Sequence, residues 1–182
     1  MIETNWIVIT GAPSSGKSSV IDAIEKLGYC VQREVARVLI EELKRAGATL
    51  EDICKDQIAL QRAIIAREIS NEAVRDPQQL TFLDRGMGDR ITYDRLLGLD
   101  PSETLALASR YRCKAVFIMD RLPFVQDDVR IEDEATAKLL DLMLEEDYRS
   151  LGYRPCRVPV MPIEERVELI IESTGVRIGK IC

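Results

Sequence analysis

The chain has 182 residues, of which 46% are apolar and 31% charged, enough for one domain with an aliphatic core. Its net charge of -6 argues against nonspecific binding to nucleic acid or to anionic membranes, because proteins that bind these usually carry a basic excess. The absence of histidine excludes Ser-His-Asp triads, imidazole general bases and zinc sites with a histidine ligand.

Strands and helices are predicted to alternate along the chain. Short apolar or β-prone runs predict strands at 6–10, 29–32, 79–83, 115–119 and 157–160. Helical spacing predicts helices at 17–27, 34–46, 135–151 and 162–171, two short helices within 88–112, and one long helix over 49–75 capped by Thr49. We therefore expect a single α/β domain over residues 1–182, with a parallel sheet covered by helices on both faces. The charged segment 120–134 lacks a helical stripe, and we expect it to be an exposed lid loop.

A glycine-rich loop follows the first predicted strand. The stretch GAPSSGKS at 11–18 matches the P-loop pattern G-x-x-x-x-G-K-[ST] and precedes an amphipathic helix. Such a loop turns backbone N–H groups toward phosphates, and the helix that follows adds its positive N-terminal dipole. We expect Lys17 to contact the outer phosphates and Ser18 to ligate Mg²⁺. The nucleotide-binding residues predicted in this way are Gly11, Ala12, Pro13, Ser14, Ser15, Gly16, Lys17, Ser18 and Ser19.

The nucleotide is expected to be ATP rather than GTP, because the sequence lacks an NKxD motif for guanine and a DxxG motif after the third strand. Asp84 ends that strand, at the sheet edge where open α/β folds bind ligands. A carboxylate there can hold Mg²⁺ through water or accept a proton from an attacking hydroxyl, and Arg85 can orient a polar acceptor. Alternatively, Asp84 caps the next helix and Arg85 is solvated.

Other candidates for the acceptor and transfer sites carry charge. Glu34 and Arg37 share a helical face and can line an acceptor pocket, or can form an ordinary surface pair. Arg121 and Arg130 both lie in the expected lid, where arginines can neutralise charge on the transferring phosphoryl group, or are solvated. The polar residues of the long helix are interpreted chiefly as a solvated face, with acceptor binding as the alternative; they are Gln57, Gln61, Arg62 and Glu68.

The five scattered cysteines suggest neither a disulfide framework nor a metal knuckle, and they favour a reducing cytoplasm. The N-terminal stretch has no basic region typical of a signal peptide. No apolar run approaches the roughly 20 residues of a membrane-spanning helix, so we expect no membrane span. The sequence does not indicate an oligomeric state.

Several motifs in order resemble those of the AAA_28-type P-loop ATPases, a group that includes the ribosylnicotinamide-kinase domain of NadR-like proteins. These motifs are TGAPSSGKSS, REVAR, FLDRGMGDR, the run VFIMDRLPFVQDDVRIEDE, and LGYRPCRVPVMPIEER, and the resemblance covers roughly residues 5–172. It implies a five-stranded parallel sheet in the order 2-3-1-4-5, phosphate and Mg²⁺ on Lys17 and Ser18, Asp84 as the acidic residue after the third strand, and Arg130 in a lid. It also implies that Glu34 and Arg37 form an acidic and basic pair.

Two functions therefore compete. The first is a small-molecule kinase that transfers the γ-phosphoryl group of ATP–Mg²⁺ to a nucleoside-like hydroxyl, with Lys17, Asp84, Arg121 and Arg130 as catalytic residues, and with Ser18 and Asp84 at the metal. Glu34, Arg37 and Arg85 would bind the acceptor. The second is a regulatory nucleotide switch or slow NTPase that acts through a protein or lipid partner. An open cleft lined by Glu34, Arg37, Asp84 and Arg85 favours the kinase, whereas a cleft filled by side chains favours the switch.

Overall fold

The computed structural model describes residues 1–122 and 134–175. The strands in these ranges are β1 (Ile2–Glu3), β2 (Trp6–Thr10), β3 (Cys30–Gln32), β4 (Thr81–Asp84), β5 (Tyr111–Arg112), β6 (Ala115–Met119) and β7 (Cys156–Val158). The helices are α1 (Lys17–Lys26), α2 (Val35–Arg45), α3 (Leu50–Cys54), α4 (Gln57–Val74), α5 (Met87–Leu96), α6 (Ser102–Ala108), α7 (Glu134–Ser150) and α8 (Ile163–Ser173). Arg130 and most of the expected lid, residues 123–133, lie outside the described ranges.

Five strands form the main sheet in the order β3-β4-β2-β6-β7, and every neighbouring pair is parallel. These are the second, third, first, fourth and fifth strands expected from the sequence, so the predicted order is confirmed. A second, two-stranded parallel sheet joins β1 to β5 and was not predicted. Each of its strands has only two residues, which is too short to give a pattern.

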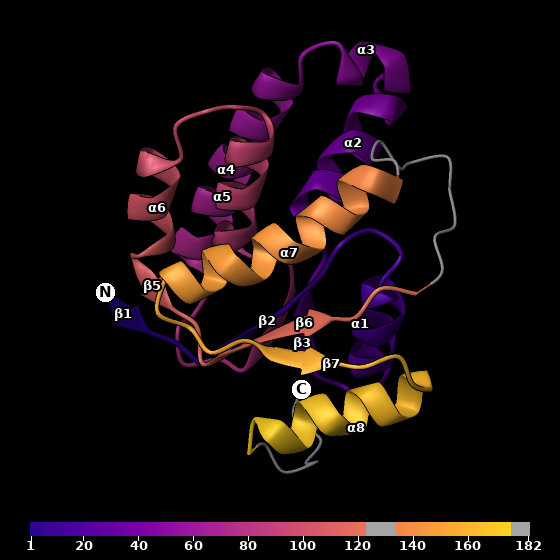
Figure 1. The fold of residues 1–182 in the computed structure, drawn as a ribbon, viewed down its shortest axis with the longest axis vertical. Helices are drawn as coiled ribbons and strands as arrows, with labels where there is room; N and C mark the ends of the chain where they lie inside the picture. The colour runs from indigo at the N-terminus through magenta and orange to yellow at the C-terminus, as the bar shows by residue number, and fades with distance from the viewer. Residues whose placement is uncertain (123–133, 176–182) are drawn as a thin grey trace.

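Helices cover both faces of the main sheet (Figure 1). The helices α1 and α8 pack together on one face, while α4, α5 and α7 lie on the other. The chain alternates between β-strands and helices because parallel neighbours require crossover connections. This confirms the predicted three-layer α/β class. Across the described ranges, no helix is both long enough and apolar enough to cross a bilayer.

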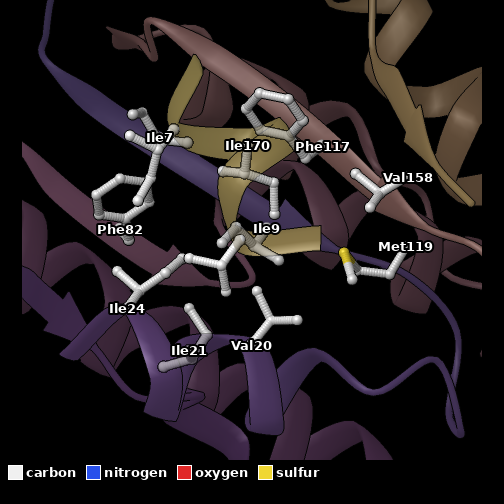
Figure 2. Close-up of a cluster of buried hydrophobic side chains, with 12 residues drawn as sticks. Ile7, Ile9, Val20, Ile21, Ile24, Phe82, Phe117, Met119, Val158 and Ile170 are labelled. Atoms are coloured by element: carbon white, nitrogen blue, oxygen red, sulfur yellow. The ribbon is translucent and has the colours of Figure 1, made fainter. Parts of the chain in front are cut away.

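The central strand β2 is buried on both faces, as an apolar run in a parallel sheet should be. Ile7 and Ile9 pack against α1 and α8, whose side chains converge on the strand in Figure 2. Trp6 and Val8 point to the opposite face and pack with Tyr148 of α7. The strand that leads into the glycine loop is therefore fixed between two cores.

The prediction of one helix over 49–75 was wrong, because the helix is interrupted between α3 and α4. Thr49 caps α3 as expected and accepts a hydrogen bond from the Asp52 amide. The Asp56 carboxylate then accepts from the Ala59 amide at 2.8 Å and starts a second helix. A capping aspartate offers the backbone an alternative to continuing the helix, and this explains the break.

Candidate active site

The glycine loop connects β2 to α1 and takes a conformation that side chains with a Cβ rarely adopt. Gly11 and Gly16 have φ angles of 145° and 80°, and Ser14 has a φ of 62°. A Cβ atom on Gly11 would lie 2.7 Å from the Met119 carbonyl oxygen of β6, so this position has no room for a side chain. No side chain caps the N-terminus of α1 at Gly16. The helix N-terminus therefore suits an anion.

The Lys17 ammonium lies across the loop, although only 7% of the residue is exposed. Its Nζ donates to the carbonyl oxygens of Gly11 and Ala12, at 2.7 and 3.1 Å, and to the Ser15 hydroxyl at 3.3 Å. Burial and the nearby positive charge of Arg85 lower the pKa of Lys17 to about 8. The loop thus concentrates positive charge at its centre, where phosphate oxygens could be bound.

Two contacts from distant segments support the outer side of the loop. The buried Arg166 of α8 donates from Nη1 to the Ser15 carbonyl oxygen at 2.7 Å. The Leu122 amide, after β6, donates to the Ser14 carbonyl oxygen at 2.7 Å. Both contacts use loop carbonyls, so the N–H groups of the loop can face the opposite side.

Asp84 lies at the C-terminal end of β4, beside the strand that carries the loop. It is 4% exposed, and its Oδ1 atom is buried without a hydrogen-bond partner within the described part of the chain. Burial and the negative charge of Glu34 raise the pKa of Asp84 to about 6. An orphan carboxylate oxygen of this kind fits either a proton or a hard cation.

Arg85 bridges two carboxylates from different elements. Its Nε donates to Glu34 Oε1 at 2.8 Å, and its Nη1 donates to Asp89 Oδ1 at 2.9 Å. Burial opposes ionisation of Glu34, but the positive charges of Arg85 and Lys17 outweigh this effect and lower the pKa of Glu34. Glu34 is therefore a carboxylate at neutral pH, and Arg85 fixes its position.

Asp89 is fully buried in the first turn of α5 and anchors this arrangement. Besides Arg85, its carboxylate accepts hydrogen bonds from the hydroxyls of Thr10 and Tyr148 and from the Gly86 amide. Burial opposes its ionisation, yet the positive charge of Arg85 and the other contacts lower the pKa of Asp89. The end of β2, the turn after β4 and α7 thus meet at the carboxylate of Asp89.

These elements enclose a cavity of about 400 Å³. One side is formed by the loop residues from Pro13 to Ser19. The other sides are formed by the polar residues Glu34, Arg37, Gln57, Gln61, Arg85 and Arg90 and by the mostly apolar residues Ala36, Ile40, Leu60, Ile64, Tyr93, Leu96 and Leu97. The volume falls within the range typical of sites for small molecules.

The structure brings most of the predicted site residues together and separates a few. The expected acceptor residues Glu34, Arg37 and Arg85 line the cavity beside most of the glycine loop. Asp84 does not line the cavity. Arg121 follows β6, and its Nε is buried without a partner among the described residues, away from the cavity lining. Arg130 lies outside the described residues.

The sequence analysis missed several buried polar residues of the site. Asp89 and Arg90 follow the LDRG motif directly, and the repeated Asp-Arg pair in DRGMGDR was a signal for them. Gln61 and Glu68 were interpreted as solvated, but they are 3% and 5% exposed. Nothing in the local sequence marks them, because the surface that covers them comes from α5.

A buried strand, a glycine loop with lysine and serine, and a helix under a five-stranded parallel sheet define a P-loop protein of the α/β class. Solved structures of P-loop kinases share this fold. A NadR protein solved with NAD and AMP-PNP gives a TM-score of 0.66 at 15% identity, with 98% of this chain and 52% of the NadR chain covered. The present chain therefore spans about half the length of that protein.

Two further solved structures match over nearly their full lengths. Thymidylate kinase from Ehrlichia chaffeensis gives a TM-score of 0.65 at 16% identity and covers 94% of this chain and 98% of its own. Deoxyadenosine kinase from M. mycoides, solved with dCMP and dCDP, gives a TM-score of 0.61 at 16% identity. That match covers 93% of this chain and 98% of the kinase. No curated protein matches the sequence. The family model of the AAA_28 AAA domain matches residues 6–166, and the chain belongs to this family.

Proposed function

We propose that the chain is a kinase that transfers the γ-phosphoryl group of ATP to a hydroxyl of a nucleoside-like acceptor. One observation carries the proposal: the glycine loop and the Glu34–Arg85 pair line the same cavity. A transferase must hold donor phosphates and acceptor hydroxyl within reach of each other, whereas a passive nucleotide binder needs only the loop. The kinases of similar fold agree with this proposal.

The residues of the loop would hold the donor. Backbone N–H groups and Lys17 would bind the phosphates, and the lysine would draw charge from the transferring group. Ser18 and Asp84 offer the hydroxyl and carboxylate oxygens that Mg²⁺ prefers, and the orphan Oδ1 of Asp84 fits this use. Magnesium would neutralise charge on the phosphates.

Glu34 is the better placed carboxylate for the acceptor. It lines the cavity, its side chain keeps 19% exposure, and Arg85 holds it ionised. Asp84 does not line the cavity and has a raised pKa. In the proposed step the acceptor hydroxyl gives its proton to the Glu34 carboxylate, and its oxygen forms a bond to the γ-phosphorus. The bond from that phosphorus to the bridging oxygen breaks, and ADP leaves with the electron pair.

The competing function, a regulatory switch, requires nucleotide binding without transfer. It fits less well, because the acceptor side is an open cavity rather than a surface filled by side chains. Nucleotide binding alone also does not require a buried arginine that holds a carboxylate at the cavity, as Arg85 holds Glu34.

The test is a turnover assay of the purified chain with ATP, Mg²⁺ and a panel of nucleosides, with products identified by mass spectrometry. We expect at least one nucleoside to raise ATP consumption well above background hydrolysis and to gain one phosphoryl group. ATP binding with no acceptor that raises turnover would reject the kinase and favour the switch.

A further inference from the structure

Gln61 is held in one orientation at the inner wall of the cavity. Its side-chain Nε2 donates two hydrogen bonds, both of 2.9 Å, to the Arg90 carbonyl oxygen and to Asp94 Oδ1. The residue lines the cavity on α4, and both partners belong to α5. Gln61 is only 3% exposed, so its amide has little freedom to rotate.

The orientation follows from the chemistry of the partners. A backbone carbonyl and a carboxylate can only accept hydrogen bonds, so the amide nitrogen of Gln61 must face them. The other oxygen of Asp94 accepts from the Thr104 hydroxyl, which fixes the carboxylate in turn. Both hydrogens of Nε2 are thereby used within the described part of the chain, so Oε1 is the polar atom that Gln61 can offer to a ligand.

The surroundings make this acceptor selective. Apolar side chains from three helices form much of the wall; they are Ile40, Leu60, Ile64, Leu96 and Leu97. A ring that enters this region loses its water. A ligand N–H that reaches Gln61 Oε1 replaces the hydrogen bond that water would donate to this oxygen. A ligand without such a donor leaves the oxygen without a hydrogen bond, which lowers its affinity.

We propose that Gln61 is a specificity-determining residue that selects acceptors whose ring carries an amino or amide N–H group. This inference rests on the proposed function and names the substrate class of the same cavity. Asp94 acts as a positioning residue, because it decides which end of the Gln61 amide faces the ligand.

The experiment compares nucleosides that differ only in the ring amino group. Adenosine is paired with purine riboside, and cytidine with pyrimidin-2-one riboside. For each pair kcat/KM is measured with ATP–Mg²⁺, and Kd is measured separately by calorimetry. We expect the wild-type chain to favour the amino member of at least one pair by about tenfold, in line with one buried hydrogen bond.

Gln61→Leu should bring that ratio to within about twofold, since leucine has similar size and no acceptor. Gln78→Leu serves as the matched control, because Gln78 is an exposed glutamine that does not line the cavity, and it should keep the wild-type ratio.

Asp94→Asn tests the orientation itself. The Thr104 hydroxyl would donate to the new amide oxygen, so the new NH₂ group would face Gln61 and draw its Oε1 away from the ligand. The preference for amino nucleosides should then weaken or reverse. A reversed ratio is not expected from a loss of stability alone.

The outcomes separate this inference from the proposed kinase. Equal use of both members of each pair, with a ratio unchanged in Gln61→Leu, would overturn the inference and leave the kinase intact. Binding that favours amino nucleosides through Gln61 without any phosphoryl transfer would support the inference and reject the kinase. Failure of every nucleoside to bind would overturn both.

Discussion

Arg85 and Glu34 are joined by a 2.8 Å hydrogen bond from Nε to Oε1, although 51 residues separate them in sequence. Arg85 adopts a left-handed backbone with a φ of 70°, which costs energy for a residue with a Cβ. Its ion pairs with Glu34 and with the buried Asp89 offset that cost. The turn after β4 thus places the Arg85 guanidinium between the carboxylate of Glu34, which lines the cavity, and the buried carboxylate of Asp89.

Glu34→Gln should separate catalysis from nucleotide binding. The glutamine oxygen can still accept from Arg85, so the geometry should survive while the proton acceptor is lost. We expect kcat to fall by about 100-fold or more, as is typical when a general base is removed, with ATP affinity changed by less than about threefold. Glu41→Gln, on the exposed part of the same helix, is the control and should behave as wild type. An unchanged kcat in Glu34→Gln would exclude the proposed role.

Asp89→Asn should destabilise the fold more than the removal of any single hydrogen-bond partner of Asp89 does. The change breaks a buried ion pair and leaves an NH₂ group facing hydroxyl and amide donors. We expect a loss of about 3 kcal/mol in unfolding free energy, against about 1 kcal/mol for Tyr148→Phe, which removes one hydrogen bond. Urea denaturation of both variants measures this difference. Equal losses would mean that the charge of Asp89 contributes little.

Gly11→Ala should abolish nucleotide binding, because the new methyl group would meet the Met119 carbonyl oxygen at 2.7 Å and would require a positive φ. Gly98→Ala is a matched control, since Gly98 also has a positive φ of 70° but has no atoms within 4 Å of the new methyl position. The control should lose about 1 kcal/mol of stability and retain binding. Thermal shift with ATP–Mg²⁺ reports both effects, and a normal shift in Gly11→Ala would contradict the account of the loop.

The parts of the fold that the sequence predicted are those specified locally. The run at 6–10, the loop at 11–18 and the helix after it each carry their signal within a few residues, and their order fixes the strand and the helix that flank the glycine loop. The break at Asp56 was missed because an aspartate inside an apolar pattern looks like a solvated residue.

The acceptor side of the site was only partly predictable, for a physical reason. Glu34 and Arg37 could be found because they directly follow a strand that ends at the ligand edge. Gln61 becomes a site residue only when α5 packs against α4 and supplies its two acceptors. Such a pairing depends on how two amphipathic helices meet, and a single sequence does not encode that contact as a local pattern.

Lys17→Ala should remove ATP-dependent turnover. The alanine leaves the loop carbonyls of Gly11 and Ala12 without their cation and removes the positive charge that would bind the phosphates. We expect either no thermal shift with ATP–Mg²⁺, or binding without detectable turnover. Lys26→Ala at the exposed end of α1 controls for the general loss of a lysine. Wild-type turnover in Lys17→Ala would contradict the proposed mechanism.

Asp84→Asn should make the protein without nucleotide more stable at neutral pH. Burial raises the pKa of Asp84 from 3.8 to about 6, so the folded state holds this proton more tightly than the unfolded chain does. The free energy of unfolding of the wild type should therefore fall as the pH rises from about 4 through 6. The asparagine variant should not show this fall, because it has no group that titrates at this position. The difference in unfolding free energy should grow by about 2 kcal/mol across that window and stay level above it. Denaturation of both proteins between pH 4 and pH 8 measures it. A constant difference over the whole range would mean that folding does not raise the pKa of Asp84.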